Sequence, residues 1–551
     1  MHSEPIKYRN QSETSDADAG SVSRAAGDAA PSRARLGILW DGAAIALLAG
    51  TALVVLAVPV FPSECGPIHL YYVDIIRSLL THSGPYTQHF EIKTLLPPYA
   101  LEYYSLLVFE MVFSPEMSEK LLVCCYIFAF GLGFKYLVDS VAERHSPWTL
   151  AGAPFCMNLL VYMGFMNYCF GVAQVLFLSG LWIRCQGRFS PGRVTVLLAG
   201  FVLMLLTHPV PIAIFLLFTG LHFVADLARA AAGGSWLWAP SLRARWRPLA
   251  LIALMAVIAA IWVGMFVDHA QRGPAEPSSV AQIGWIRSVA GALRLGHVVP
   301  FRSPFYRIGL LLLVATAGVA LLVSIWRRRG RASSAAIAMI ATSAICFTLL
   351  CVAPDSINGS AYFPDRFAIL WVMFLIAAAA ALHPPRSWSL AAGVIALCAT
   401  SVVLPFQWVT ASRIASELRP ALEAPLAKAG SVGLLIGAKH SREGDLWFAP
   451  FFWGGAHYFR RSGAILANAP WMWQTHIMLR PAHPDRWTGM GPYPAGQSLV
   501  NALSAGATAP DLSFVVWEGP PSAVSQAIVA GLAFTPLPPN GRMLGIYARQ
   551  P

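Results

Sequence analysis

The chain has 551 residues, of which 56% are hydrophobic and only 12% are charged. Soluble globular proteins carry about 25% charged residues, so this composition excludes an ordinary soluble protein and indicates one that resides in lipid. The formal net charge of +12 does not indicate a nucleic-acid partner, because the arginines lie at the ends of hydrophobic runs, where they act as topology signals.

Residues 1–36 are rich in Ser, Ala, Asp and Arg without an apolar period, which predicts a disordered cytoplasmic tail. No pattern of a cleaved signal peptide precedes the first apolar run. A membrane-spanning helix needs about 20 apolar residues. Eleven candidate runs follow, at residues 37–61, 119–138, 148–163, 166–184, 194–207, 209–228, 248–267, 306–326, 333–352, 366–382 and 387–406. The predicted fold is therefore an all-α polytopic membrane domain over residues 37–406 with about eleven transmembrane helices. The third and fifth runs are short enough to be re-entrant or to depend on a neighbour.

Lysine and arginine are unevenly distributed between alternate loops. The long loop 62–118 has two in 57 residues, and residues 353–365 have none. The N-terminal tail and the alternate turns contain Lys and Arg at a far higher density. These turns are 139–147, 184–193, 229–247, 327–331 and 383–386. By the positive-inside rule the dense set faces the cytoplasm. The N-terminus is then inside, and an odd number of spans places residues 407–551 outside.

The segment 407–551 is predicted to be a small extracytoplasmic α/β domain. Residues 431–437, 512–518 and 542–550 have the composition of short strands bounded by turn residues, and 521–534 has helical spacing. Aromatic residues are concentrated between residues 445 and 491. These aromatic residues form a surface that stacks on carbohydrate, or they form the core of this domain or lie at the membrane interface.

The loop 62–118 contains the principal candidate for catalysis, Asp74. In HLYYVDIIRSLL the spacing of the apolar residues predicts a helix, and Asp74 follows closely after the first span. There it is positioned to take a proton from an attacking hydroxyl or to help hold a divalent metal. An ion pair with Arg77, three residues on, is the structural alternative. His69, Arg77, Glu91 and Lys93 are further candidate binding residues. For Glu91 and Lys93 a solvated loop face is the favoured alternative.

Three further segments on the same predicted side carry candidate binding residues. His208 lies in THPVP between two predicted spans, where it either donates to a phosphate or packs the turn. Arg302 lies in the loop 268–305, whose basic amphipathic stretch 283–296 is predicted to lie in the headgroup plane. Charge facing lipid is costly, so we expect these loops to enclose a wet cavity at the outer surface.

The segment YFPDRF contributes Tyr362, Asp365 and Arg366. An arginine can bind a lipid phosphate through two parallel hydrogen bonds. The alternative is a carboxylate at a helix start followed by an interfacial arginine.

This organisation resembles the GT-C superfamily of integral-membrane glycosyltransferases. The shared features are a first span, a long external loop with an acid near its start, the amphipathic stretch LLPPYALEYYSLLVFEMVF, spans joined by short basic turns, and an extracytoplasmic C-terminal domain. In that superfamily the acid of the first loop often belongs to a DxD, DD or ED pair. Here Val73 and Ile75 flank Asp74, and the nearest upstream acid is Glu64.

The resemblance implies transfer of a sugar from a polyprenyl-phosphate donor to an envelope glycan, lipid or protein on the outer face of a bacterial inner (plasma) membrane. Asp74 would be the general base of an inverting displacement, and a divalent metal (Mg or Mn) is the candidate cofactor. Arg366, Arg302 or His208 would face the leaving phosphate, where negative charge develops.

Two other functions compete with this reading. A transporter or lipid flippase usually has ionisable groups near the midplane and internal symmetry, whereas the spans here contain no acid at mid-membrane depth and no repeated half. A catalytically inactive GT-C-like scaffold of envelope assembly is compatible with the lone acid at Asp74.

Overall fold

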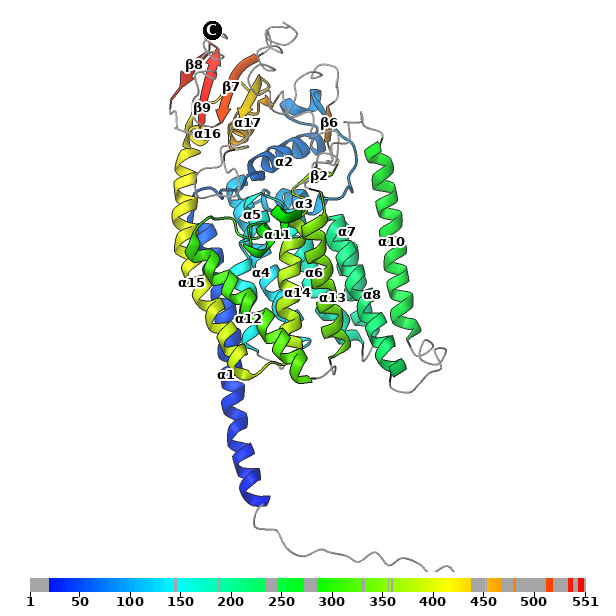
Figure 1. The fold of residues 1–551 in the computed structure, drawn as a ribbon. Coiled ribbons are helices and arrows are strands. Elements are labelled where there is room, and N and C mark those ends of the chain that lie inside the picture. Colours follow the sequence, from blue (N-terminus) through cyan, green and yellow to red (C-terminus); the bar gives the residue numbers. More distant parts are fainter. Residues whose placement is uncertain are drawn as a thin grey trace, which may run out of the picture.

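The computed structural model describes residues 19–549 except 143–145, 187–188, 233–244, 272–284, 329–331, 355, 358–359, 438–450, 452, 467–478, 482–511, 519–533 and 539–543. Within these residues, eight helices are long and apolar enough to cross a membrane. They form a bundle with a small β-sheet above one end (Figure 1). The protein is therefore a mostly helical, multi-pass membrane protein.

The eight long helices coincide with eight of the predicted spans. They are α1 (Ala19–Ala57), α4 (Pro115–Asp139), α6 (Met166–Cys185), α8 (Pro209–Ala232), α10 (Trp246–Gln271), α12 (Pro304–Arg328), α13 (Ser334–Val352) and α15 (Arg386–Glu417). The prediction of a disordered tail over residues 1–36 is wrong from residue 19 onward, where α1 already begins. That segment is rich in alanine, the residue with the highest helix propensity.

Shorter elements occupy the other three predicted spans. They are α7 (Pro191–Leu205), α14 (Asp365–Ala381), and the 3₁₀ helix η2 (Pro147–Phe155) followed by α5 (Leu159–Tyr162). Residues 148–163 are thus not one continuous helix. Pro154 lies inside η2, and the Asn158 side chain starts α5 by accepting a hydrogen bond from Leu160 N at 3.0 Å.

Helix α14 forms the centre of the bundle. Its side chains are almost all buried, including the alanine run Ala377–Ala381. It packs against α12 and α13. Small side chains let neighbouring helices approach closely, which is how helices associate in lipid, where burial of apolar surface supplies little driving force.

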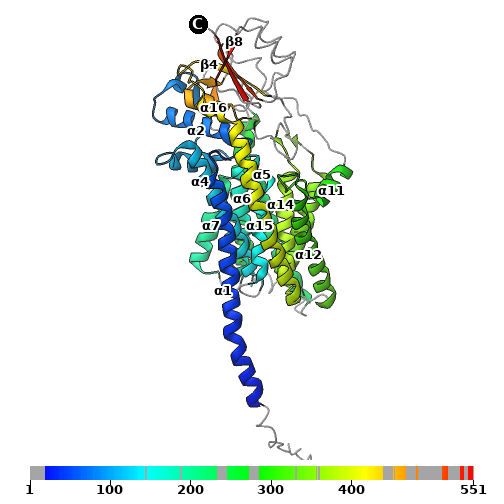
Figure 2. The same ribbon diagram turned by 90° about the vertical axis from the view of Figure 1, so that its left-hand side faces the viewer.

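The predicted outer loops gather at one end of the bundle, called here the sheet end (Figures 1 and 2). Its elements before the C-terminal region are α2 (Gly66–Leu80), η1 (Pro85–Gln88), β1 (Phe90–Ile92), α3 (Ala100–Phe109), α11 (Trp285–Leu293), β2 (Ser356–Ile357) and β3 (Ser360–Ala361). The α7–α8 turn with His208 lies at the same end, and the described parts of the basic turns lie at the opposite end. The two sets of loops are therefore separated as the Lys and Arg count predicted.

The C-terminal region contains a five-stranded sheet in the order β5-β4-β7-β9-β8. Its elements are α16 (Arg419–Glu423), β4 (Val432–Gly437), α17 (Ala456–Ser462), β5 (Ile465–Leu466), β6 (Leu479–Pro481), β7 (Leu512–Glu518), β8 (Phe534–Leu537) and β9 (Leu544–Arg549). Strand β4 runs parallel to β5 and β7, whereas β9 is antiparallel to β7 and β8. The three predicted strands are confirmed, and residues 521–533 of the predicted helix lie outside the described residues.

Part of the aromatic stretch 445–491 is described, and its rings are internal. Phe451, Trp453 and Tyr458 are at most 1% exposed. In these residues the stretch forms protein core and does not offer a surface for stacking on carbohydrate.

The sheet is attached to the loop that follows α1. Strand β6 pairs antiparallel with β1 in the register Phe90 to Pro481. The Tyr71 hydroxyl of α2 donates to Ala464 O at 3.1 Å and accepts from Leu466 N at 3.0 Å, next to β5. The C-terminal region therefore rests on α2 and β1.

Candidate functional site

Asp74 lies on α2 in a row of alternating charges between α2, α4 and α17. Its carboxylate pairs with Arg77, and Arg460 Nη1 of α17 lies 3.9 Å away. Arg77 Nη1 also contacts Glu110 Oε2 at 3.0 Å, and Arg460 also pairs with Glu116 at the start of α4. Burial raises the pKa of Asp74, although the two arginines partly offset this effect. The predicted Arg77 partner is present, together with one from the C-terminal region.

The surroundings of Asp74 do not fit a divalent metal. Guanidinium groups from Arg77 and Arg460 flank the carboxylate on two sides. Mg²⁺ and Mn²⁺ prefer several oxygen ligands, and two adjacent cations oppose a third. Across the described residues, no group of three His, Cys, Asp or Glu side chains could hold a metal ion.

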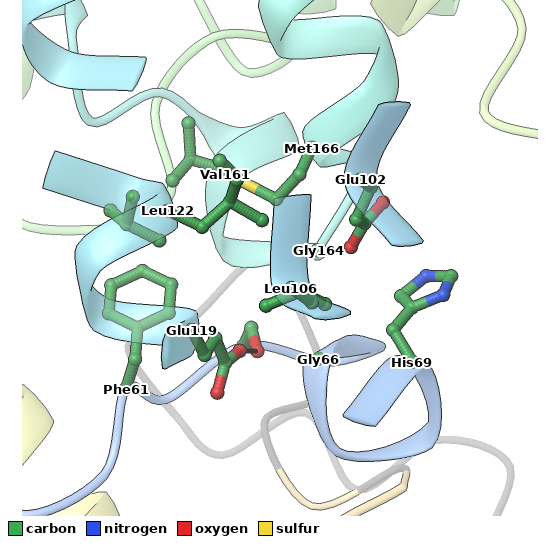
Figure 3. Close-up of a pocket in the computed structure, with 12 residues that line it drawn as sticks. Phe61, Gly66, His69, Glu102, Leu106, Glu119, Leu122, Val161, Gly164 and Met166 are labelled. Atoms are coloured by element: carbon green, nitrogen blue, oxygen red, sulfur yellow. Dashed lines mark hydrogen bonds between the residues drawn. The ribbon is translucent and has the colours of Figure 1, made fainter. Parts of the chain in front are cut away.

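A small pocket lies beneath α2, between α3, α4 and the start of α6 (Figure 3). Its polar lining consists of Ser63, His69, Glu102 and Glu119. It has room for about one water molecule. Gly66 completes the wall, because a Cβ at this position would overlap Glu119 Oε1 and Ser63 Oγ.

Glu102, in the first turn of α3, is held by two reciprocal hydrogen bonds to Asn167 of α6. Its backbone N–H donates to Asn167 Oδ1 at 2.9 Å, and Asn167 Nδ2 donates to Glu102 Oε2 at 2.8 Å. The side chain is only 3% exposed. Burial and the nearby Glu119 carboxylate raise the pKa of Glu102 well above its usual range.

His69 is the predicted binding residue that does line this pocket. Its Nδ1 lies 3.0 Å from the Tyr103 hydroxyl. Burial lowers the pKa of His69 to about 4, so the imidazole is neutral at pH 7 and can exchange a hydrogen bond with a hydroxyl.

Arg366, at the start of α14, lies in an aromatic cage that includes a second predicted residue, His208. The guanidinium lies over the rings of Phe165 at 5.7 Å and Phe363 at 5.8 Å. The Tyr168 hydroxyl donates to Arg366 O, and the Tyr168 ring lies 5.2 Å from the His208 ring. Arg366 and His208 are 8% and 4% exposed, respectively. Two of the predicted phosphate-facing residues are therefore linked through one tyrosine.

Tyr99 closes the cage from the first long loop. Its ring centroid lies 5.1 Å from that of His208, and its N–H donates to Thr207 O at 2.9 Å. Both Tyr99 (φ 70°) and Tyr362 (φ 59°) have left-handed backbone conformations. Such strain costs about 1–3 kcal/mol per residue and is concentrated at functional sites. Tyr362 contacts Phe165 of the cage, with a centroid distance of 6.3 Å.

Asp365 is turned toward a different partner. His297 Nδ1 lies 2.9 Å from Asp365 Oδ1, which ties the segment before α12 to the start of α14. The remaining predicted residues lie outside both groups. Glu91 lies in β1 opposite Arg480, Lys93 follows this strand, and Arg302 is exposed before α12. None of these three lines the pocket in Figure 3.

The pocket and the Arg366 cage meet at the first turn of α6. Phe165 and Tyr168 contact Arg366, while Asn167 binds Glu102. Tyr99 and Glu102 lie three residues apart on the other wall. The sequence alone does not single out Glu102, Asn167, Tyr99 or Tyr168. The Pro97–Pro98 break and an acid inside LEYYSLLVF were the available signals.

Glu64 is a further buried acid beside the pocket. It is 6% exposed, and its N–H donates to Tyr162 O at 2.7 Å. Burial raises the pKa of the adjacent Cys65 thiol, and the Glu64 and Glu102 carboxylates raise it further, so the two acids lie near the same thiol.

Among solved structures, the chain resembles the crystal structure of ArnT from Cupriavidus metallidurans bound to undecaprenyl phosphate. The TM-score is 0.52 at 12% sequence identity, and the match covers 93% of this chain and 99% of that chain. No family model and no curated protein matches the sequence. A likeness at this identity concerns the fold, and it confirms the resemblance expected from the sequence. The chain therefore shares its overall fold with this ArnT structure.

Proposed function

We propose that the protein is a membrane glycosyltransferase that moves a sugar from a polyprenyl-phosphate donor to a hydroxyl of an envelope glycan, lipid or protein. The observation that carries this proposal is the fold match over 93% of the chain to ArnT, a protein crystallised with undecaprenyl phosphate. The uneven Lys and Arg distribution supports a bacterial inner-membrane orientation with the sheet end outside and eleven crossings, three of them through α7, α14 and η2–α5.

Arg366 is the proposed phosphate-binding residue. An arginine can donate two parallel hydrogen bonds to a phosphate, and the low dielectric of a buried cage strengthens them. His208 and Tyr99 place an imidazole and a phenol beside the Tyr168 ring, and these two groups can donate to the remaining phosphate oxygens. The Tyr168 hydroxyl already donates to Arg366 O. As the bond to the sugar breaks, charge develops on this phosphate, and the cage would stabilise it.

The general base is proposed to be Glu102, and the experiment tests it against Asp74 and Glu64. Glu102 is joined to the Arg366 cage through neighbouring residues of α6, whereas Asp74 pairs with Arg77 and Arg460 toward the C-terminal region. A raised pKa makes Glu102 a stronger base than an ordinary carboxylate once it is deprotonated. Asp74, the base that the superfamily resemblance implies, remains the competing assignment.

The test has two readouts. In host cells, mass spectrometry compares the envelope glycans of the Glu102→Gln, Asp74→Asn and Glu64→Gln variants, with protein amount measured in parallel. We expect Glu102→Gln to abolish one glycan product while full-length protein persists. Loss of the product only in Asp74→Asn would move the base to Asp74. In detergent, the purified protein should bind undecaprenyl phosphate. Absence of binding, together with unchanged glycans in all three variants, would exclude the transferase and favour a scaffold.

A further inference from the structure

The pocket of Figure 3 combines two buried acids with no cation in its lining. Of the residues that the structure describes, 12 line this pocket, and none is Lys or Arg. Glu102 and Glu119 are 3% and 4% exposed, respectively. The two carboxylates approach the space from α3 and α4, and His69 comes from α2. The pocket therefore exposes two acids to one water-sized cavity.

Neutral groups make the hydrogen bonds to both carboxylates. Asn167 Nδ2 donates to Glu102 Oε2 at 2.8 Å, and Ser63 Oγ donates to Glu119 Oε1 at 2.5 Å. Glu119 Oε2 is buried and has no hydrogen-bond partner among the described residues. Lys120 acts on Glu119 through its charge, while its Nζ donates hydrogen bonds to Leu56 O at 3.2 Å and to Val58 O at 3.0 Å.

Two ionised carboxylates in these surroundings would be unfavourable. Burying one unpaired ion costs several kcal/mol, and a second like charge nearby adds repulsion. A carboxylic acid and a carboxylate that face each other across a water avoid both effects. The water also satisfies the Glu119 oxygen that otherwise lacks a partner, since buried waters make about three such bonds. We propose that Glu102 and Glu119 share one proton through a single bound water, forming a proton-accepting pair.

The other titratable groups described around Glu119 do not take over the role of the shared proton. His69 on α2 is neutral at pH 7, because burial lowers its pKa to about 4. The Cys65 thiol stays protonated, because burial raises its pKa. On α4, Glu116 is paired with Arg460, and the positive charges of Arg460 and Lys120 both act on Glu119. Arg460 therefore already has a carboxylate partner.

The pair has a use in the proposed reaction, and this part of the inference rests on the proposed function. The acceptor hydroxyl gives its proton to the Glu102 carboxylate as its oxygen forms the bond to the anomeric carbon. The bond from that carbon to the polyprenyl phosphate breaks, and the phosphate leaves with the electron pair. The shared proton moves through the water to Glu119, so Glu102 can accept the new one without leaving a second charge.

Infrared spectroscopy of the purified protein tests the pair without any substrate. We expect a C=O stretch of a protonated carboxylic acid at neutral pH that titrates only at alkaline pH. In Glu119→Gln, the midpoint of the remaining Glu102 band should shift to lower pH, because the neighbouring charge is gone. Glu102→Gln should shift the Glu119 band in the same direction. Glu423→Gln, which removes an exposed acid paired with Arg419, should leave the band and its midpoint unchanged.

The proposal is wrong if no such band exists at neutral pH, or if each single variant leaves the midpoint of the other acid unchanged. Ser63→Ala serves as a second variant should Glu119→Gln fail to fold. It removes a hydrogen bond to the ionised form of Glu119, so it should move the midpoint to higher pH, and an unchanged midpoint would also contradict the pair. These readouts do not depend on sugar transfer, so loss of the transferase proposal would leave them intact.

Discussion

At the scale of single residues, Arg366 is unusual because it is 8% exposed beside aromatic rings at the end of a helix bundle. If Arg366 binds a lipid phosphate, Arg366→Gln removes charge-assisted hydrogen bonds worth about 1.5–3 kcal/mol, or about 10- to 150-fold in affinity. Arg366→Lys should lose less, because it keeps the charge without the planar fork.

Binding of undecaprenyl phosphate to the purified variants, measured by native mass spectrometry, checks this expectation. Arg327→Gln provides the matched control, since this exposed arginine lies at the opposite end of the bundle. Equal losses in Arg366→Gln and Arg327→Gln would show that only general electrostatics is involved.

Glu110 gives a pH-dependent prediction at the same scale. Burial, then the Asp74 charge, raises its pKa from 4.5 to about 7, and Arg77 and Arg460 only partly offset this. Between these values the folded protein binds more protons than the unfolded chain, so stability falls as pH rises from about 4.5 to about 7. In Glu110→Gln this part of the fall should disappear from thermal unfolding curves recorded across that range. An unchanged pH profile would contradict the shift.

Contacts of single side chains are also the feature that the sequence predicts least completely. Asp74 and Arg77 could be paired from their spacing, because three residues is one helical turn. Arg460 could not be added, since it lies nearly 400 residues away and only the docking of α17 brings it close. Glu102 could not be identified as a site residue for a related reason. Its burial and its raised pKa depend on contacts with Asn167 and Glu119, which lie on other helices.

At the scale of elements, the apolar runs predicted the long helices because a span needs enough apolar residues to cross lipid, whatever it packs against. Residues 148–163 are different, because they are enclosed by α1, α4 and α15. Buried surroundings can satisfy an irregular backbone that lipid could not, and composition alone does not distinguish the two. The same enclosure explains how α14 can be only 17 residues long.

The alanine run of α14 supplies a prediction about packing. Ala378 is fully buried among neighbouring helices, so Ala378→Leu must push them apart, at a cost of about 1–3 kcal/mol. Ala344→Leu on α13 is the control, because that side chain is exposed. Thermal unfolding in one detergent should show a lower midpoint for the first variant and little change for the second. Equal midpoints would mean that α14 is not tightly packed.

At the scale of the whole molecule, the bundle and the sheet are joined by few but specific contacts. The Tyr71 hydroxyl bridges Ala464 and Leu466, and β1 pairs with β6. The sequence predicted an apolar bundle followed by short strands, because the change from apolar runs to strand-like segments is visible in composition. The boundary was predicted at residue 407, whereas α15 continues to Glu417. The sequence could not predict that the first loop and the C-terminal region form one surface, since no local pattern encodes a contact between distant segments.

Arg460 gives the last prediction, which concerns this joint. Its guanidinium lies between Glu116 and Asp74, and its side chain is 9% exposed. Arg460→Gln leaves two mostly buried carboxylates facing each other, which should cost about 3 kcal/mol. Arg419→Gln breaks an exposed pair with Glu423 and should cost about 0–1 kcal/mol.

Hydrogen exchange locates the effect of Arg460→Gln. We expect amides of α2, α17 and β5 to lose protection, whereas the amides of α12 and α13 should not change. Adding Glu116→Gln should restore part of the loss, because the double variant no longer buries that unpaired charge, and the two substitutions should therefore not be additive. Uniform loss across the bundle, or strict additivity, would mean that Arg460 stabilises the fold in general and does not hold the C-terminal region to the first loop.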